Sequence, residues 1–203
     1  MWIAPTTKLE GSVVTLEPLE AKHAPDLLAA AEPDLFRFTP QMPLEWSLAG
    51  FERDIVRIKN IPEMVAFAIV HNASGRAIGR TTYMDIRAAQ RGAEIGNTWI
   101  ARAHQATLVN PEIKYLMLRR AFEALTPTAI RIELKTGGTN LHSQRAIAKL
   151  GAVREGVLRK YRIVPDGSDP NGPKMVRDTV VFSILDDEWP AVKRGLERRL
   201  AGG

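Results

Sequence analysis

EIGNTWI at residues 94–100, ARAHQATLVN at 101–110 and PEIKYLMLRRAF at 111–122 form one continuous stretch. The first segment has the apolar character of a short strand, and the last places apolar residues at helical spacing. Asn110 is a favourable N-cap, and Pro111 suits the first helical position, where its missing N–H is harmless. The stretch therefore predicts a strand, a loop and a helix that starts at Asn110 and Pro111.

The predicted helix start favours an anionic ligand. The first N–H groups of a helix have no partner within it, so they can hold a phosphate without help from a basic side chain. Lys114 opposes the helix dipole unless an anion lies nearby, which makes it a candidate cofactor contact. The alternative is a solvated surface lysine.

The composition indicates one globular domain over residues 1–203. The chain has 45% hydrophobic and 25% charged residues, with a net charge of +5 and an isoelectric point near 9.7. This charge favours anionic partners such as phosphate-bearing cofactors. We expect no nucleic-acid partner, because no dense basic patch with interleaved aromatic residues is evident.

The sequence contains no cysteine. Disulfides, thiolate metal sites and a thioester on the protein are therefore excluded. The longest clear apolar run, VAFAIV at residues 65–70, is too short to span a bilayer, and the first residues lack a signal-peptide core. We expect a cytoplasmic protein without membrane attachment.

The rest of the chain alternates strands and helices around the central stretch. Before it we expect a strand at 12–17, helices at 24–31 and after Ser47, an irregular loop at 32–46, and strands at 66–70 and 77–86. After it we expect a strand at 130–135, a helix from Asn140 to Gly151, strands at 153–163 and 175–185, and a helix at 187–200. This order predicts a single α/β (α+β) domain with a mixed, mostly antiparallel sheet of about seven strands and helices on both faces.

With this element order, the segments NLHSQRAIAKLGAVREGVLRK at 140–160 and RDTVVFSILDDEW at 177–189 resemble the GNAT superfamily of N-acetyltransferases. Within the superfamily, the chain looks most like the branch that acetylates ribosomal-protein N-termini at Ser or Ala. The resemblance covers nearly the whole chain. It implies an acetyl-CoA-dependent transferase acting on a primary amine.

The resemblance also assigns positions to the cofactor. The backbone of the central strand would face the pantetheine arm, the loop after it would wrap the pyrophosphate, and the helix near residue 140 would lie beside the lower arm and thioester. The residues so implied are Asn97, Thr98, Trp99, Ile100, Gln105, Ala106, Thr107, Leu108, Val109, Asn110, Asn140 and Ser143.

Two positions depart from the family pattern. The family loop reads Gln/Arg, two residues, Gly, one residue, Gly/Ala, and mapping from Gln105 puts Leu108 and Asn110 at the glycine positions. A leucine side chain resists positive φ and a close approach to phosphate, so we expect binding to depend on the helix start and Lys114. Ile147 stands where many members carry an aromatic acid, so we assign no tyrosine acid.

Glu94 is the candidate base, because it opens the central strand and a glutamate there faces the acceptor in the resembling branch. The alternative is a structural glutamate, in solvent or in an ion pair with an arginine at 80, 87 or 91. Ser143 is a candidate donor to the departing sulfur, or an ordinary first-turn serine. His104 and His142 lack metal or nucleophile spacing, so both are interpreted as structural or solvated and no metal is expected.

The acceptor is the least defined part. Phe36, Phe38, Trp46 and the 165–175 loop are candidates for its pocket, with core packing favoured for at least two of the aromatic residues. A protein N-terminal amine is the leading acceptor, because its pKa near 8 asks only for a modest base. A small-molecule amine, a non-catalytic binding module of the same fold and a homodimer are open alternatives.

Overall fold

The computed structural model describes residues 2–39, 41, 43–166 and 172–202. Within these residues eight strands form one sheet in the order β1-β2-β3-β4-β5-β6-β8-β7. All neighbours are antiparallel except β5 and β6, which are parallel. The strands are β1 Leu9–Glu10, β2 Val14–Pro18, β3 Val65–His71, β4 Arg76–Arg87, β5 Gly92–Ile100, β6 Arg131–Gly137, β7 Val153–Pro165 and β8 Lys174–Leu185.

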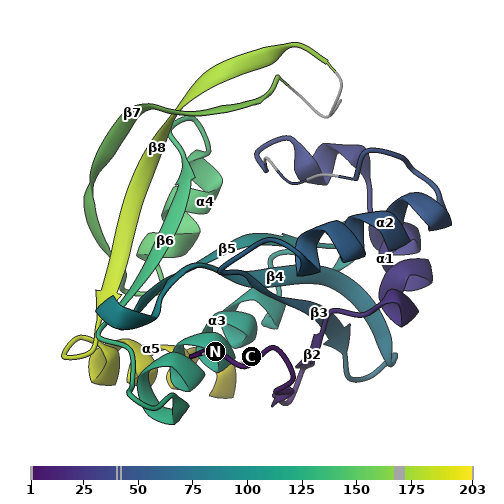
Figure 1. Ribbon diagram of the computed structural model, residues 1–203. Helices are drawn as coiled ribbons and strands as arrows, with labels where there is room; N and C mark the ends of the chain where they lie inside the picture. The colour runs from purple at the N-terminus through teal and green to yellow at the C-terminus, as the bar shows by residue number, and fades with distance from the viewer. Residues whose placement is uncertain (1, 40, 42, 167–171, 203) are drawn as a thin grey trace.

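Helices cover both faces of this sheet (Figure 1). The α-helices are α1 Ala24–Ala30, α2 Leu48–Lys59, α3 Val109–Arg119, α4 Leu141–Ala148 and α5 Trp189–Ala201. The predicted mixed sheet with helices on both faces is confirmed. The additional strand is β1, whose two residues are too short to leave a periodic signal.

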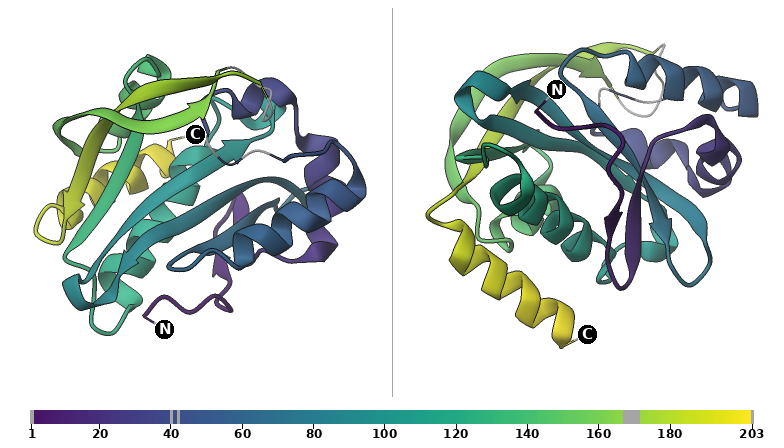
Figure 2. Two further views of the ribbon diagram at one scale, coloured as in Figure 1. Left: turned by 45° about the horizontal axis from the view of Figure 1, so that its top comes forward. Right: turned by 60° about the horizontal axis from the view of Figure 1, so that its bottom comes forward.

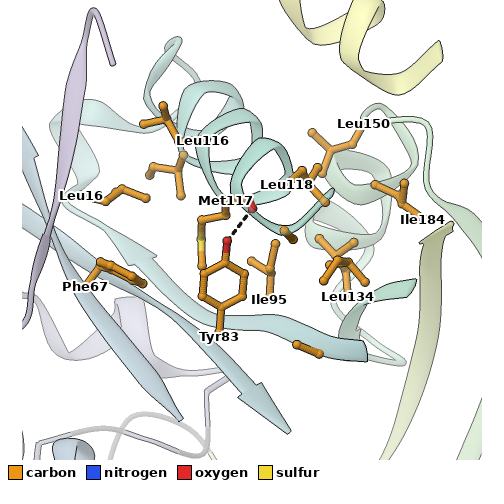
Figure 3. Close-up of a cluster of buried hydrophobic side chains, with 14 of the residues drawn as sticks. Leu16, Phe67, Tyr83, Ile95, Leu116, Met117, Leu118, Leu134, Leu150 and Ile184 are labelled. Carbon is orange, nitrogen blue, oxygen red and sulfur yellow. Dashed lines mark hydrogen bonds between the residues drawn. The ribbon is translucent and has the colours of Figure 1, made fainter. Parts of the chain in front are cut away.

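The two faces of the sheet carry separate cores. The larger core lies under α3 and α5 and includes Tyr83, Met117 and Leu134 (Figure 3). Its Tyr83 hydroxyl donates to the carbonyl of Met117, so the buried phenol is satisfied. The smaller core joins α1 and α2 to the other face through Phe51 and Trp99. Each fully buried large side chain contributes about 1.5–3 kcal/mol, so both helix layers are fixed on the sheet.

Two of the three predicted helix caps are confirmed. The Ser47 hydroxyl accepts from the N–H of Gly50 at 3.0 Å, and the Asn140 side chain accepts from the N–H of Ser143 at 3.1 Å. The predicted cap at Asn110 is wrong, because α3 begins at Val109, two residues before the expected first helical residue Pro111. The Thr107 hydroxyl accepts from the Val109 N–H at 3.3 Å, so a residue before the helix supplies the acceptor expected from Asn110.

β5 and β6 separate after a short contact. They pair only at Gly92–Glu94 with Arg131–Glu133 within the described residues, and β5 then carries a bulge at Asn97, whose φ is +49°. On the far side of the opening, the hairpin of β7 and β8 arches toward the segment before α2 (Figures 1 and 2). The sheet is thereby split above α3, and the split leaves room for a ligand between its halves.

Candidate active site

A cavity of about 490 Å³ lies in this split, between β5, β6, α3, α4 and β8. It brings together most of the residues predicted to form the site. These lining residues are Glu94, Asn97, Thr98, Trp99, Ile100, Gln105, Ala106, Asn110, Lys114, Asn140 and Ser143. Three predicted residues, Thr107, Leu108 and Val109, do not line it, and the Val109 side chain is buried in the larger core.

The β5 bulge leaves polar groups of the strand available to a ligand. Asn97 takes left-handed backbone angles, which asparagine tolerates better than most residues. Its side-chain nitrogen is buried and has no hydrogen-bond partner in the part of the chain that the structure describes. A buried donor without a partner is costly, so this wall of the cavity is suited to a ligand that offers acceptors.

The loop before α3 presents free backbone donors. The N–H groups of Ala106, Thr107 and Leu108 make no hydrogen bond to any described residue. Gln105 does not reach outward, because its side-chain nitrogen donates to the Ile100 carbonyl at 3.0 Å. Consecutive free N–H groups at a helix start suit a phosphate, so residues 106–108 form a cradle for the pyrophosphate that the resemblance implies.

Leu108 does not distort this cradle. Its backbone is helical, with φ of −72° and ψ of −9°, whereas the left-handed residue of the loop is Ala106 at φ +59°. The expectation that a glycine-requiring conformation falls on Leu108 is therefore wrong. The reason is the earlier helix start, which draws Leu108 into the first turn and moves the tight bend two residues back.

Lys114 lies at the base of the cavity and is only 6% exposed. Its ammonium group donates to the Thr98 hydroxyl at 2.9 Å, and Thr98 in turn lies 2.8 Å from the Thr81 hydroxyl. Burial lowers the pKa of Lys114 to about 8, and no carboxylate among the described residues pairs with it. The solvated-lysine alternative is wrong, and the buried cation attracts a negatively charged ligand.

Glu94 also lines the cavity and is only 4% exposed. Its carboxylate forms an ion pair with Lys135, with 3.1 Å between the Glu94 Oε2 and Lys135 Nζ atoms. The arginines considered from sequence do not reach it. Arg80 pairs with Asp54, Arg87 with Asp85 and Glu133, and Arg91 bonds to Thr128. The register explains why Lys135 is the partner. Glu94 of β5 lies beside Glu133 of β6, and Lys135 follows two residues later on the same face of β6.

The ion pair is one end of a chain of charges across the sheet. Lys135 also contacts Glu133 at 2.8 Å, Arg131 bonds to Glu133 at 3.0 Å, and Arg131 forms a two-pronged pair with Glu155. Burial opposes the charge on Glu133, but Lys135 and Arg131 lower its pKa to about 2. Burial likewise opposes the charge on Lys135, and the two glutamates nevertheless raise its pKa. This chain keeps Lys135 charged and fixed beside Glu94.

α4 contributes Asn140, Ser143 and His142 to the cavity wall. Because the Asn140 side chain accepts from the backbone N–H of Ser143, the first turn of α4 is fixed where Ser143 lines the cavity. His142 also lines the cavity and is exposed, as solvation predicts. His104 does not line it; its ring lies 4.6 Å from that of His71, and burial, with a further contribution from His71, lowers its pKa.

The aromatic candidates divide between core and cavity. Phe36 is 1% exposed and packs with Trp99 in the smaller core. Trp46 contacts the Phe36 ring but is 37% exposed and does not line the cavity, so the expectation of core packing for at least two of the three aromatic residues is wrong. Phe38 lines the cavity. In the predicted acceptor loop at 165–175, residues 167–171 lie outside the described part of the chain.

Sequence reasoning missed Lys135, Arg162 and Arg177, which also line the cavity. The strand IRIELK carries a signal for the first of them. Its charged residues alternate with apolar ones, so Arg131, Glu133 and Lys135 share one face of β6. The two arginines carry no comparable signal, because their place depends on how the β7–β8 hairpin curves.

Neither a metal site nor a membrane span is evident in the described residues. No group of three metal-ligating side chains is placed to hold an ion there. None of the helices in this part of the chain is both long and apolar enough to cross a bilayer.

The chain matches known acetyltransferases in sequence and structure. Residues 14–153 match the acetyltransferase (GNAT) domain. A T. thermophilus protein assigned as an acetyltransferase is 38% identical, with a TM-score of 0.86 over 98% of this chain and 100% of the other. A GCN5-related N-acetyltransferase from Brucella melitensis is 30% identical, with a TM-score of 0.84 over 95% and 85%.

A more distant likeness concerns the fold alone. Mycobacterium smegmatis RimJ, solved with CoA-disulfide, is 23% identical with a TM-score of 0.75 over 97% of this chain and 93% of the other. No curated protein sequence matches the chain. The family match covers more than half of the chain. The cradle at residues 106–108, with its free backbone donors, suits a phosphate-bearing cofactor. The chain therefore belongs to the GNAT acetyltransferase family and is an N-acetyltransferase that uses acetyl-CoA.

Proposed function

We propose that this enzyme acetylates the α-amine of a protein or peptide N-terminus by direct transfer in a ternary complex. The observation that carries the proposal is the position of Glu94, a buried carboxylate in the same cavity as the phosphate cradle. Donor and acceptor can therefore meet in one cavity. The sequence has no cysteine to carry the acetyl group between them.

The cofactor would be held mainly by backbone. The cradle at residues 106–108 and the buried Lys114 would bind its phosphates, and the β5 wall from Asn97 to Ile100 would face its pantetheine arm. When bound, acetyl-CoA supplies the acetyl group as a thioester. The residues around it fix its position and exclude water, which keeps the acetyl group from hydrolysis.

Glu94 would accept the proton of the acceptor amine. An α-amine has a pKa near 8, so a carboxylate held in place is a sufficient base. A lysine side chain, with a pKa near 10.4, would need a stronger base. Lys135 supports this role, because its ammonium group is held between two glutamates and so orients the Glu94 carboxylate. The ion pair thus positions the base and does not exclude the catalytic interpretation.

Ser143 would serve the leaving group. Its hydroxyl lines the cavity at the start of α4, where Asn140 fixes the backbone. From there it would donate a hydrogen bond to the departing sulfur. The absence of the family's glycines at positions 108 and 110 would favour a non-catalytic module, but Ala106 to Leu108 keep free backbone donors without them.

A substrate panel tests the proposal. The enzyme is incubated with acetyl-CoA and either N-terminal peptides, the same peptides blocked at the α-amine, lysine side-chain analogues or small amines, and free thiol release is followed. We expect release with free α-amine peptides and none with the blocked ones. Release with small amines but with no peptide would replace the N-terminal acceptor by a small-molecule amine.

A further inference from the structure

Two arginines face the cavity from the β7–β8 hairpin. Arg162 and Arg177 are directly opposite in the antiparallel register, so their side chains share one face, and both line the cavity. Arg177 is only 8% exposed, whereas Arg162 is half-buried. The hairpin therefore directs two positive charges toward the end of the cavity that also contains Phe38 and Glu94.

Like charges placed opposite one another destabilise a sheet unless something offsets them. No carboxylate in the described ranges forms a salt bridge with Arg162 or Arg177. The other buried cations near this end differ, since Arg80 pairs with Asp54 and Lys135 with two glutamates. Glu94 lies near enough to Arg177 to favour its charge, but neither arginine of the pair has a described carboxylate in direct contact, as Arg80 and Lys135 do.

The local structure holds Arg177 in place. Its Nη1 atom donates to the Phe38 carbonyl at 2.8 Å, while its Nε atom is buried and has no partner among the described residues. Gly137 of β6 makes room for it, because an added Cβ there would lie 3.0 Å from the Arg177 Cδ atom. Arg162 lies 5.3 Å from the ring of Tyr161, a contact that leaves its fork of donors available.

We propose that the acceptor is an anionic amine, whose carboxylate binds Arg177 and Arg162 while its amine lies at Glu94. A planar guanidinium group matches a carboxylate in geometry, and the two arginines together would offset the negative charge of the acceptor's carboxylate. This inference rests on the proposed function and narrows it to acceptors with a carboxylate close to the reacting amine. A peptide with an acidic first residue and a free amino acid share that chemistry.

Charge-matched substrates test the inference. We compare kcat/KM for peptides that begin with Asp or Asn and with Glu or Gln, and for free amino acids against their amides. The acidic member of each pair should be favoured about tenfold or more. In Arg177→Gln the preference should disappear, and in Arg177→Lys part of it should return.

Arg159→Gln provides the matched control. Arg159 is an exposed arginine of β7 that does not line the cavity, so the preference should be unchanged in this variant. A thermal shift with acetyl-CoA shows that each variant folds and binds the cofactor. A charge preference that survives both Arg177→Gln and Arg162→Gln would overturn the inference.

The substrate arms separate this inference from the proposed function. Equal rates for both members of every pair would sink the inference and leave N-terminal acetylation standing. Acetylation of free amino acids over their amides, with no peptide acetylated, would uphold the inference and sink the N-terminal acceptor. A preference for acidic peptides supports both.

Discussion

The two ends of the cavity are built differently. The cradle end, where Gln105, Ala106, Asn110 and Lys114 line the cavity, comes from one continuous stretch of chain and offers mostly backbone donors. The charged end draws Phe38, Glu94, Lys135, Arg162 and Arg177 from distant parts of the sequence and offers side chains. A backbone site depends on local conformation, whereas a side-chain site depends on each residue that forms it.

This difference explains why Leu108 is harmless where the family has glycine. Its side chain does not line the cavity, and its N–H is free regardless of that side chain. The charged end has no such tolerance, because Glu94 and Lys135 hold one another in position through their ion pair. Substitutions at the two ends should therefore differ in size and in the step they affect.

The largest effect is expected at the charged end. Glu94→Gln should lower kcat about 100-fold, because a neutral amide cannot take the amine's proton. The loss should be greatest at acidic pH, where most of the amine is protonated, while the Kd for acetyl-CoA stays nearly unchanged. Rates of acetyl transfer across pH, with binding measured by calorimetry, check this.

Glu155→Gln is the control for this change, because Glu155 lies at the other end of the charge chain and outside the cavity lining. We expect its kcat to remain within about threefold of the wild type. If Glu94→Gln is no slower than this control at any pH, then Glu94 has only a structural role.

Lys114→Met should raise the Kd for acetyl-CoA about tenfold at pH 7, because a cation facing the phosphates is lost. In the wild type the affinity should fall as the pH rises through about 8, where Lys114 loses its proton. The variant should lack this decline. Calorimetric titrations between about pH 6.5 and pH 9 measure both, and an equal decline in the variant would contradict the assignment.

The same substitution should raise stability in the absence of cofactor. Burial lowers the pKa of Lys114 from 10.5 to about 8, so folding disfavours its charged form. This cost is fully present below about pH 8 and disappears as the pH rises to 10.5. At pH 7 the Tm of Lys114→Met should therefore exceed that of the wild type, and the difference should shrink toward pH 10.5.

A smaller effect is expected from the shape of the cradle. Ala106→Val should weaken acetyl-CoA binding about fivefold, because a β-branched side chain resists the left-handed conformation at this position. Leu108→Gly should change the Kd by less than about twofold, since Leu108 is already helical. Tighter binding by Leu108→Gly would show that the leucine hinders the cradle after all.

A small effect on the chemical step is expected at Ser143. Ser143→Ala should lower kcat about threefold, through the loss of one hydrogen bond to the leaving sulfur. The Kd for acetyl-CoA should not change, because the Asn140 cap uses the backbone N–H of Ser143 and not its hydroxyl. Single-turnover measurements give the rate of acetyl transfer, and Ser143→Thr should recover part of the rate that Ser143→Ala loses.

The sequence predicts local features of this molecule well and distant ones poorly. The caps at Ser47 and Asn140 are confirmed because each is decided by atoms three residues apart. The predicted cap at Asn110 is wrong because α3 begins at Val109, whose N–H donates to the Thr107 hydroxyl. The burial of Lys114 and the pairing of Glu94 with Lys135 depend on how separate elements pack, which periodicity does not encode.

The short contact between β5 and β6 has a consequence for ligand choice. Beyond Glu94, β6 turns away from β5, so the backbone groups on this edge of β5 have no neighbouring strand among the described residues. An extended molecule with its own amide groups can occupy such an edge by β-augmentation, and the pantetheine arm has two amides. This edge recognises the spacing of donors and acceptors along the arm. Nucleotides that end at the pyrophosphate should therefore bind only at the cradle and compete poorly with coenzyme A.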